Sequence, residues 1–290
     1  MNPFLDITKS QPLEKMVIHT NYHDGTKENI NKVVCALEFR SETLKELKFC
    51  DLNFQQVDLS SISRLECLER LKFTNCKDFT YGHYEALSKK RLGFKELEFR
   101  GMMSSNDIEA LFNSLHSEAL LKLTLSDITP KIAKAIKESC PRIGSLDITI
   151  CSEQLLDSII PLICELSSLK FLRISISDRY ADILVRKLGD CFTSIECLYL
   201  RFHVDLLSFE YFINNCKANF NKLDLPFGDE TTRKDYLICV DNFQKVRKSL
   251  KVLGIRIYGG WTNEELEIIH SLQNQGVNIV FSCDFYKMFW

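Results

Sequence analysis

The stretch Leu68-Glu-Arg-Leu71-Lys-Phe73-Thr-Asn-Cys76 decides the fold, because the spacing of its apolar residues returns along the whole chain. A leucine takes the place of Leu71 in each copy, at Leu47, Leu71, Leu97, Leu123, Leu146, Leu172, Leu198, Leu223 and Leu253. The intervals between these leucines are 24, 26, 26, 23, 26, 26, 25 and 30 residues. Self-similarity at a nearly fixed interval indicates stacked structural units, none of which is stable alone.

Each copy predicts a short strand, and an interval near 26 residues is typical of leucine-rich repeats. Side chains alternate across a strand, so Leu71 and Phe73 at the fourth and sixth positions face one side. Arg70 and Lys72 at the third and fifth positions face the other side. The predicted fold class is therefore α/β: a leucine-rich-repeat solenoid, a curved horseshoe with parallel strands on the concave face and helices on the convex face.

Helical spacing of apolar residues predicts the segments that return the chain from one strand to the next. We expect helices over residues 28–39, 130–138, 154–166, 181–188, 206–215, 236–246 and 263–273, and one around residues 108–115. Capping boxes are predicted at Asn106 with Glu109 and at Thr262 with Glu265. The charged stretch 228–235 is expected to be a solvated loop, with partner contact as the alternative.

In the later repeats the alternation of apolar residues continues to Ile150, Ile176, Phe202 and Ile257. It predicts strands that are longer by one pair, with an added row of core side chains. An exposed apolar ligand groove is the alternative.

The repeat pattern predicts one elongated domain with three parts. Residues 1–42 form an amino-terminal cap and a degenerate first repeat around Leu13-x-x-Met16-x-Ile18, residues 43–275 form the repeat array, and residues 276–290 form a capping strand and tail. We expect the apolar tail to cover the end of the core, because terminal repeats need a cap. A docking peptide is the alternative role of the tail.

Composition excludes several classes of function. A net charge of −2 gives no general attraction for nucleic acid or for a membrane surface. We find no secretory leader and no long apolar run, so a cytoplasmic protein is expected, with the nucleus as the alternative. The 12 cysteines lack CxxC spacing and are expected to be reduced packing groups. The sequence lacks the common phosphate-binding, zinc-protease and nucleophile motifs, so no enzyme, metal or cofactor is expected.

Particular copies resemble the cysteine-containing repeats of F-box proteins. These are the stretch 68–76, Ile143-x-x-Leu146-x-Ile148-x-x-Cys151, and the cysteines at positions 140, 191 and 216; stretches 34–49 and 64–76 resemble fungal members of that group. In such proteins an F-box binds the Skp adaptor of a cullin ubiquitin ligase, and the repeats select the substrate. The resemblance therefore implies substrate recognition, with Skp adaptor and cullin as partners if an F-box is supplied elsewhere.

Two alternatives to the ligase function stay open. Only 12 residues precede Leu13, too few for an F-box, so the chain is expected to be either the substrate-binding part alone or a stand-alone scaffold or inhibitor. A GTPase-activating protein is a third hypothesis, because such proteins present an arginine to the nucleotide. Arg100, Arg201 and Arg256 follow strand cores and are the candidates.

The predicted concave sheet supplies the candidate site for a protein ligand. In the first half, Glu46, Arg70, Glu96 and Lys122 alternate in sign from strand to strand, and we expect such neighbours to pair. In the second half, aromatic and arginine side chains gather, as they do in interface hot spots. The expected partner-binding residues are Phe171, Arg173, Tyr199, Arg201, Asp147, Lys122, Lys222 and Asp224.

Overall fold

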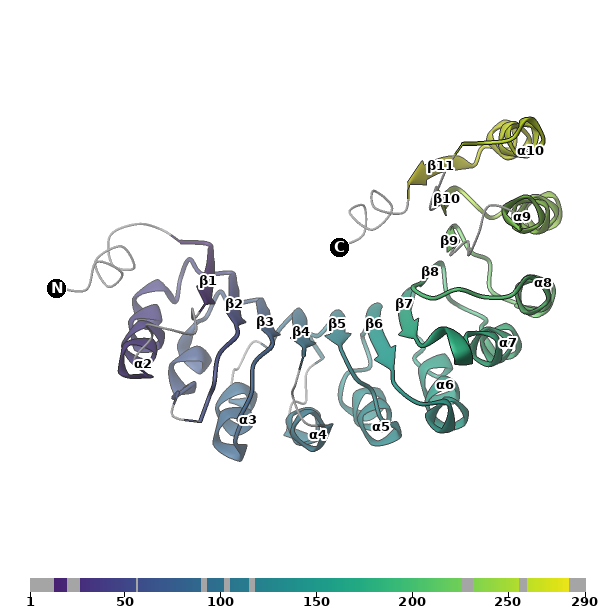
Figure 1. Cartoon of the computed structure of the whole chain (residues 1–290). Coiled ribbons are helices and arrows are strands. Elements are labelled where there is room, and N and C mark those ends of the chain that lie inside the picture. The colour runs from purple at the N-terminus through teal and green to yellow at the C-terminus, as the bar shows by residue number, and fades with distance from the viewer. Residues whose placement is uncertain are drawn as a thin grey trace. The chain divides into compact units, whose positions relative to one another are not determined.

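The computed structural model describes residues 13–19, 27–55, 57–89, 93–101, 105–114, 118–225, 232–255 and 260–281. The chain divides into two compact units, Met1–Gly144 and Ser145–Trp290. In each unit, strands that follow one another along the chain are neighbours in a parallel sheet, and helices connect them. Figure 1 shows that the helices of each unit lie on one side of its strands. We call the opposite side of the strands the sheet face.

In the first unit the structure confirms the predicted strands, including the one at the weak amino-terminal copy. Its elements are β1 (Lys15–His19), α2 (Lys27–Ala36), η1 (Leu37–Arg40), β2 (Glu46–Cys50), η2 (Ser60–Arg64), β3 (Arg70–Thr74), α3 (Tyr81–Ser88), β4 (Glu96–Arg100), α4 (Ser105–Ser114), β5 (Lys122–Leu125) and α5 (Pro130–Ser139). The central residues of the copies are register partners from strand to strand: Met16, Leu47, Leu71, Leu97 and Leu123. The weak first copy therefore pairs in the same register as the strong ones.

The second unit repeats this arrangement. Its elements are β6 (Ser145–Ile150), η3 (Glu153–Leu155), α6 (Leu156–Cys164), β7 (Phe171–Ile176), η4 (Asp178–Tyr180), α7 (Ala181–Cys191), β8 (Cys197–Leu200), α8 (Leu206–Asn215), β9 (Lys222–Leu225), α9 (Arg233–Arg247), β10 (Val252–Ile255), α10 (Asn263–Asn274) and β11 (Asn278–Phe281). The register partners are Leu146, Leu172, Leu198, Leu223, Leu253 and Ile279. The leucines of this row are completely buried.

Aromatic side chains fill the core of the first unit between its strands and helices. Phe73 stacks between Phe49 and Phe99, with ring centroids 5.5 and 5.3 Å away. Phe54 and Phe79 meet these rings from the connecting segments, mostly edge to face. Such ring pairs add about 0.5–1.5 kcal/mol each beyond the burial of their area. The side chains at the sixth position therefore link three successive repeats of the first unit, from β2 to β4, through one stack of rings.

The structure confirms most of the expected elements and corrects others. The added core row is buried at Ile150, Ile176 and Phe202. Among the described residues the longer strand forms only in β6 and β7, since β8 ends at Leu200. Thr262 and Glu265 form the expected capping box. The box predicted at Asn106 is wrong, because α4 already begins at Ser105. Ile257 and the tail residues 282–290 lie outside the described residues, and the three-part division of the chain stays a prediction.

A glycine at the end of β4 fixes how closely two repeats approach. Gly101 has φ +99°, and a Cβ atom there would lie 2.7 Å from Asn75 Oδ1 and 2.8 Å from Asn75 Cα. Its N–H donates to Ser126 Oγ at 2.9 Å. The position therefore needs glycine for both its backbone conformation and its contact.

We expect Gly101→Ala to destabilise the first unit by more than about 1 kcal/mol, because alanine is strained at this φ and meets the backbone of Asn75. Gly82→Ala is the matched control: its φ is ordinary, and the nearest atom to the new Cβ is Thr80 Oγ1 at 3.8 Å. The control should be neutral or stabilise by about 0.4–1 kcal/mol. Thermal unfolding of both variants measures the difference, and equal melting temperatures would contradict the assignment.

Candidate functional site

On the sheet face of the first unit, charged residues pair with one another. Arg70 contacts Glu46 at 3.0 Å, and both Lys72 and Lys122 contact Glu96, at 3.0 and 3.3 Å. The expected pairing of alternating charges is thus confirmed for these neighbours. Lys122 is half-buried, and burial lowers the pKa of its ammonium group. Glu46, Arg70, Lys72, Glu96 and Lys122 on this face therefore already have partners.

Four of the expected binding residues form one row across the sheet face of the second unit. Asp147 is the register partner of Arg173, Arg173 of Tyr199, and Tyr199 of Asp224. All four occupy the fifth position of their repeats. The register of the strands therefore brings Asp147 and Asp224, which lie 77 positions apart in the sequence, into one row.

Arg173 is held at the centre of this row. Its Nη1 lies 3.2 Å from Asp147 Oδ2, and the guanidinium carbon is 5.1 Å from the centroid of the Tyr199 ring. The exposed fraction of Arg173 is only 5%, and that of Asp147 is 4%. The charged hydrogen bond to Asp147 and the cation–π contact with Tyr199 together fix the position of the Arg173 guanidinium. The contacts hold the arginine and the aromatic ring in fixed positions on the sheet face, where both are buried.

A small apolar cluster lies beside the row, mainly at the third position of the repeats. Buried Cys197 and Tyr199 form its centre, and partly buried Phe171, Val252 and Val280 pack against them. Burial raises the pKa of the Cys197 thiol to about 12, so the side chain is a neutral packing group at physiological pH. We call these five residues the face cluster.

The remaining expected residues lie around this centre. Arg201 is exposed just beyond β8, where its N–H donates to the Ile174 carbonyl at 2.9 Å. Lys222 is half-buried and Asp224 fully buried on β9. Lys122 belongs to the first unit, whereas the other seven expected residues all belong to the second unit. The alternation of the strands placed all of these residues on the sheet face, but it gave no sign of how deeply they are buried.

The sequence did not reveal a second buried charge pair. Arg233 donates to both carboxylate oxygens of Glu265, at 2.7 and 2.9 Å, and to the Gly260 carbonyl at 2.6 Å. Its guanidinium carbon also lies 4.6 Å from the centroid of the Trp261 ring. The expectation of a solvated loop over 228–235 is wrong for 233–235, because α9 begins at Arg233 and this side chain is buried. Arg233 and Glu265 therefore have hydrogen-bond partners within the fold, and the pair stabilises the second unit.

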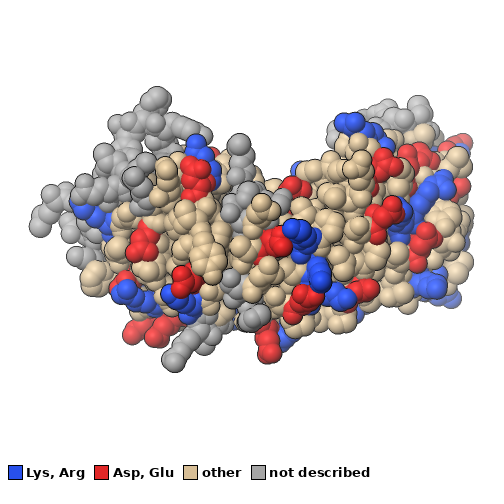
Figure 2. Space-filling view, turned by 90° about the horizontal axis from the view of Figure 1, so that it is seen from below, with Lys and Arg blue, Asp and Glu red and all other residues tan. Residues whose placement is uncertain are grey.

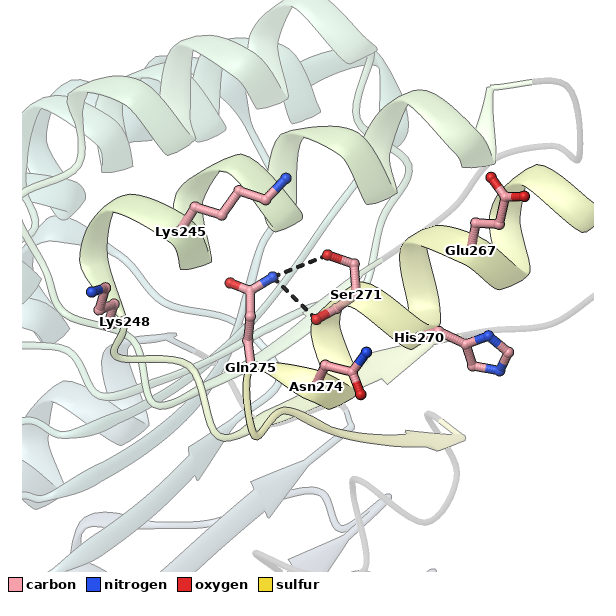
Figure 3. A pocket seen from close by; sticks show the side chains of 7 residues that line it. All are labelled: Lys245, Lys248, Glu267, His270, Ser271, Asn274 and Gln275. Carbon is pink, nitrogen blue, oxygen red and sulfur yellow. Dashed lines mark hydrogen bonds between the residues drawn. The ribbon is translucent and has the colours of Figure 1, made fainter.

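Other places in the described residues offer weaker sites. A shallow hollow between α9 and α10 is lined by Lys245, Lys248, Glu267, His270, Ser271, Asn274 and Gln275 (Figure 3). Lys245 is already paired with Asp241 at 2.5 Å, and Gln275 donates to Ser271. No group of three or more His, Cys, Asp or Glu in the described part of the chain could hold a metal ion. The hollow has no convergent set of groups for a ligand.

The arginines considered for GTPase activation differ in their surroundings. Arg100 donates to Glu98 at 2.7 Å, so its charge is already paired, and Arg256 lies outside the described residues. Arg201 is exposed but stands at the rim of the sheet face described above. The geometry therefore does not mark one arginine as a residue presented to a nucleotide.

Figure 2 shows acidic and basic side chains interspersed over the face in view, without a large area of one sign. Among the described residues, no helix combines the length and the apolar character needed to cross a membrane.

No protein-family model matches the chain, and the comparison with curated proteins found no significant match.

Proposed function

We propose that the chain is a leucine-rich-repeat protein that binds a protein partner through the sheet face of its second unit, between β6 and β9. The observation that carries this proposal is the convergence of Phe171, Arg173 and Tyr199 on adjacent strands. Arginine and aromatic side chains dominate interface hot spots, because they bury large areas and make directed hydrogen bonds. The sheet face of the first unit is the weaker candidate, since its charges pair with one another.

The partner that the sequence resemblance favours is a substrate of an F-box-type ubiquitin ligase. In this proposal the repeats select the substrate, and the F-box that binds Skp adaptor and cullin is supplied elsewhere. A stand-alone scaffold or inhibitor would use the same surface without recruiting the ligase. Both functions are binding activities and need no catalytic residue in this chain.

Affinity capture from the cell of origin tests the proposal with the variant Phe171→Ala/Arg201→Ala. Each change removes a side chain of the proposed interface, and hot-spot losses of about 1–2 kcal/mol each lower capture by tenfold or more. Lys234→Ala, on the partly exposed surface of α9, is the matched control and should capture the partner as the unchanged chain does.

Capture that is equal for all three chains would exclude the sheet face as the binding surface. Recombinant Skp adaptor and cullin added to the captured complexes separate the two functions. Their stable association supports the ligase proposal, and a partner lost in the double variant without any adaptor supports the stand-alone scaffold.

A further inference from the structure

We propose that Cys164 and Cys191 are an oxidisable pair of thiols, which closes to a disulfide between α6 and α7 when the protein meets a peroxide. Three features of the two cysteines support this assignment: their position, their neighbours and their exposure. The modification lies among the helices of the second unit, so it is independent of the partner-binding function proposed above.

The two cysteines occupy the same place in neighbouring repeats. Cys164 is the last residue of α6, and Cys191 is the last residue of α7. The two helices pack against each other, and the Cys164 thiol donates a hydrogen bond to the Cys191 sulfur. A disulfide forms only between side chains that already meet or nearly meet. The stacking of the repeats therefore brings together two thiols that lie on either side of β7 in the sequence.

A third cysteine takes the corresponding place in the next repeat, but its thiol is engaged differently. Cys216 directly follows α8, is completely buried, and donates to the Phe192 carbonyl at 3.8 Å. Burial raises the pKa of this thiol to about 11, so it stays neutral at physiological pH. Cys216 is therefore out of reach of an oxidant, and it can report on whether the unit stays folded.

Access to solvent distinguishes the proposed pair from another two neighbouring cysteines. Cys164 and Cys191 are both half-buried, so a small oxidant can reach them. Cys50 and Cys76 in the first unit also interact, but both are buried. The Cys76 thiol moreover donates to the Thr74 carbonyl at 3.4 Å. Buried thiols of this kind are inert, whereas the partly exposed pair combines contact with access.

The order of the chemical steps follows from the surroundings of Cys164. Burial and the neighbouring Cys191 and Cys216 raise the pKa of the Cys164 thiol well above its ordinary value, so Cys164 keeps its proton and Cys191 attacks first. The Cys191 thiol loses its proton and its sulfur attacks one peroxide oxygen. The O–O bond breaks, the sulfur becomes a sulfenic acid, and the other oxygen takes up the proton and leaves as water.

The second step closes the disulfide. The Cys164 sulfur attacks the Cys191 sulfur, the S–O bond of the sulfenic acid breaks, and its hydroxyl leaves with the Cys164 proton as a second water. The two sulfurs are oxidised and the peroxide is reduced to water. Thiol–disulfide exchange with a small dithiol reverses the modification.

Hydrogen peroxide treatment followed by peptide mapping without reduction tests the pair. In the unchanged chain we expect linked peptides of Cys164 and Cys191, and maleimide labelling of both should fall by about tenfold or more, because a disulfide leaves no thiol to react. Dithiothreitol should restore both thiols. Cys239 of α9 is the matched control: it is also half-buried, but its thiol donates to Glu210, at 3.8 Å, so it should stay unlinked.

Two serine variants separate the roles of the two cysteines. In Cys164→Ser the reaction should stop at the sulfenic acid of Cys191, which dimedone traps. In Cys191→Ser dimedone should leave Cys164 unlabelled, because this thiol keeps its proton. Cys216 should stay unlabelled by maleimide in all chains, since it is 0% exposed.

Two results would overturn the proposal. One is linkage of either cysteine to a different cysteine, or no linked peptides at a peroxide concentration that oxidises exposed Cys35. The other is linkage that forms only when Cys216 becomes reactive, because the unit has then unfolded first. The readout needs no partner, so the thiol pair and the proposed function can fail independently.

Discussion

Replacing Leu146 by lysine is expected to abolish the cooperative unfolding of the second unit. Leu146 is 0% exposed and lies in the leucine row, facing the helices. An ammonium group there would be buried without a partner, and such substitutions belong to the class that costs more than about 4 kcal/mol. Losses of this size approach the whole stability of a domain. Far-UV circular dichroism during heating should show a broad, early loss of structure.

Thr149→Lys is the matched control for this change. Thr149 lies three residues after Leu146 on the same strand, so its side chain points to the opposite side, the sheet face. It is only partly buried. The same new charge should there cost within about 1 kcal/mol. Equal destabilisation by both lysines would show that the assignment of the two faces is wrong.

Replacing Glu265 by glutamine is expected to destabilise the second unit by about 3 kcal/mol or more. The side chains of Arg233 and Glu265 are 3% and 1% exposed, so the substitution leaves the Arg233 charge buried without its counter-charge. Glutamine can still serve the capping box with Thr262, so the loss reports on the charge. Urea unfolding measures the difference.

The adjacent pair supplies the control for Glu265→Gln. Glu264 pairs with Lys234 on the surface, and Glu264→Gln should change stability by less than about 1 kcal/mol. Arg233→Met/Glu265→Gln should be more stable than Glu265→Gln alone, because no unpaired charge is then buried. If the single and double variants unfold together, the buried charge does not explain the loss.

The same pair gives a pH dependence with a defined sign. The hydrogen bond from Arg233 lowers the pKa of the Glu265 carboxyl below its ordinary value of 4.5. A lowered carboxyl pKa stabilises the folded state above the unfolded value, and this stabilisation disappears as the pH falls through the lowered value. The difference between the unchanged chain and Glu265→Gln should therefore shrink below about pH 4.5.

The architecture could be predicted because it depends on side chains that every repeat must bury. The spacing of Leu47, Leu71 and Leu97 fixes the strands, and period-2 alternation then fixes which face each residue occupies. The opposite charges of Arg70 and Glu46 were predicted to pair for the same reason, since neighbouring strands in register place them side by side.

Features that depend on tertiary contacts could not be predicted in this way. Arg233 sits in a run of polar residues, and only the fold brings Glu265 and Trp261 to it. The alternation put Asp224 on the sheet face, yet periodicity cannot tell that its side chain is completely buried. Asn106 has capping-box spacing with Glu109, but the helix starts one residue before it.

The central claim, that the sheet face of the second unit binds the partner, is tested most directly by site-specific photo-cross-linking in cell extract. The helices offer a rival surface, with exposed apolar side chains at Leu207 of α8 and Ile238 of α9. A photoreactive residue at Ser175 or Arg201, on and beside the sheet face, should cross-link to one common partner, and the same residue at Leu207 or Ile238 should not. Cross-links to that partner from the helix positions alone would contradict the account.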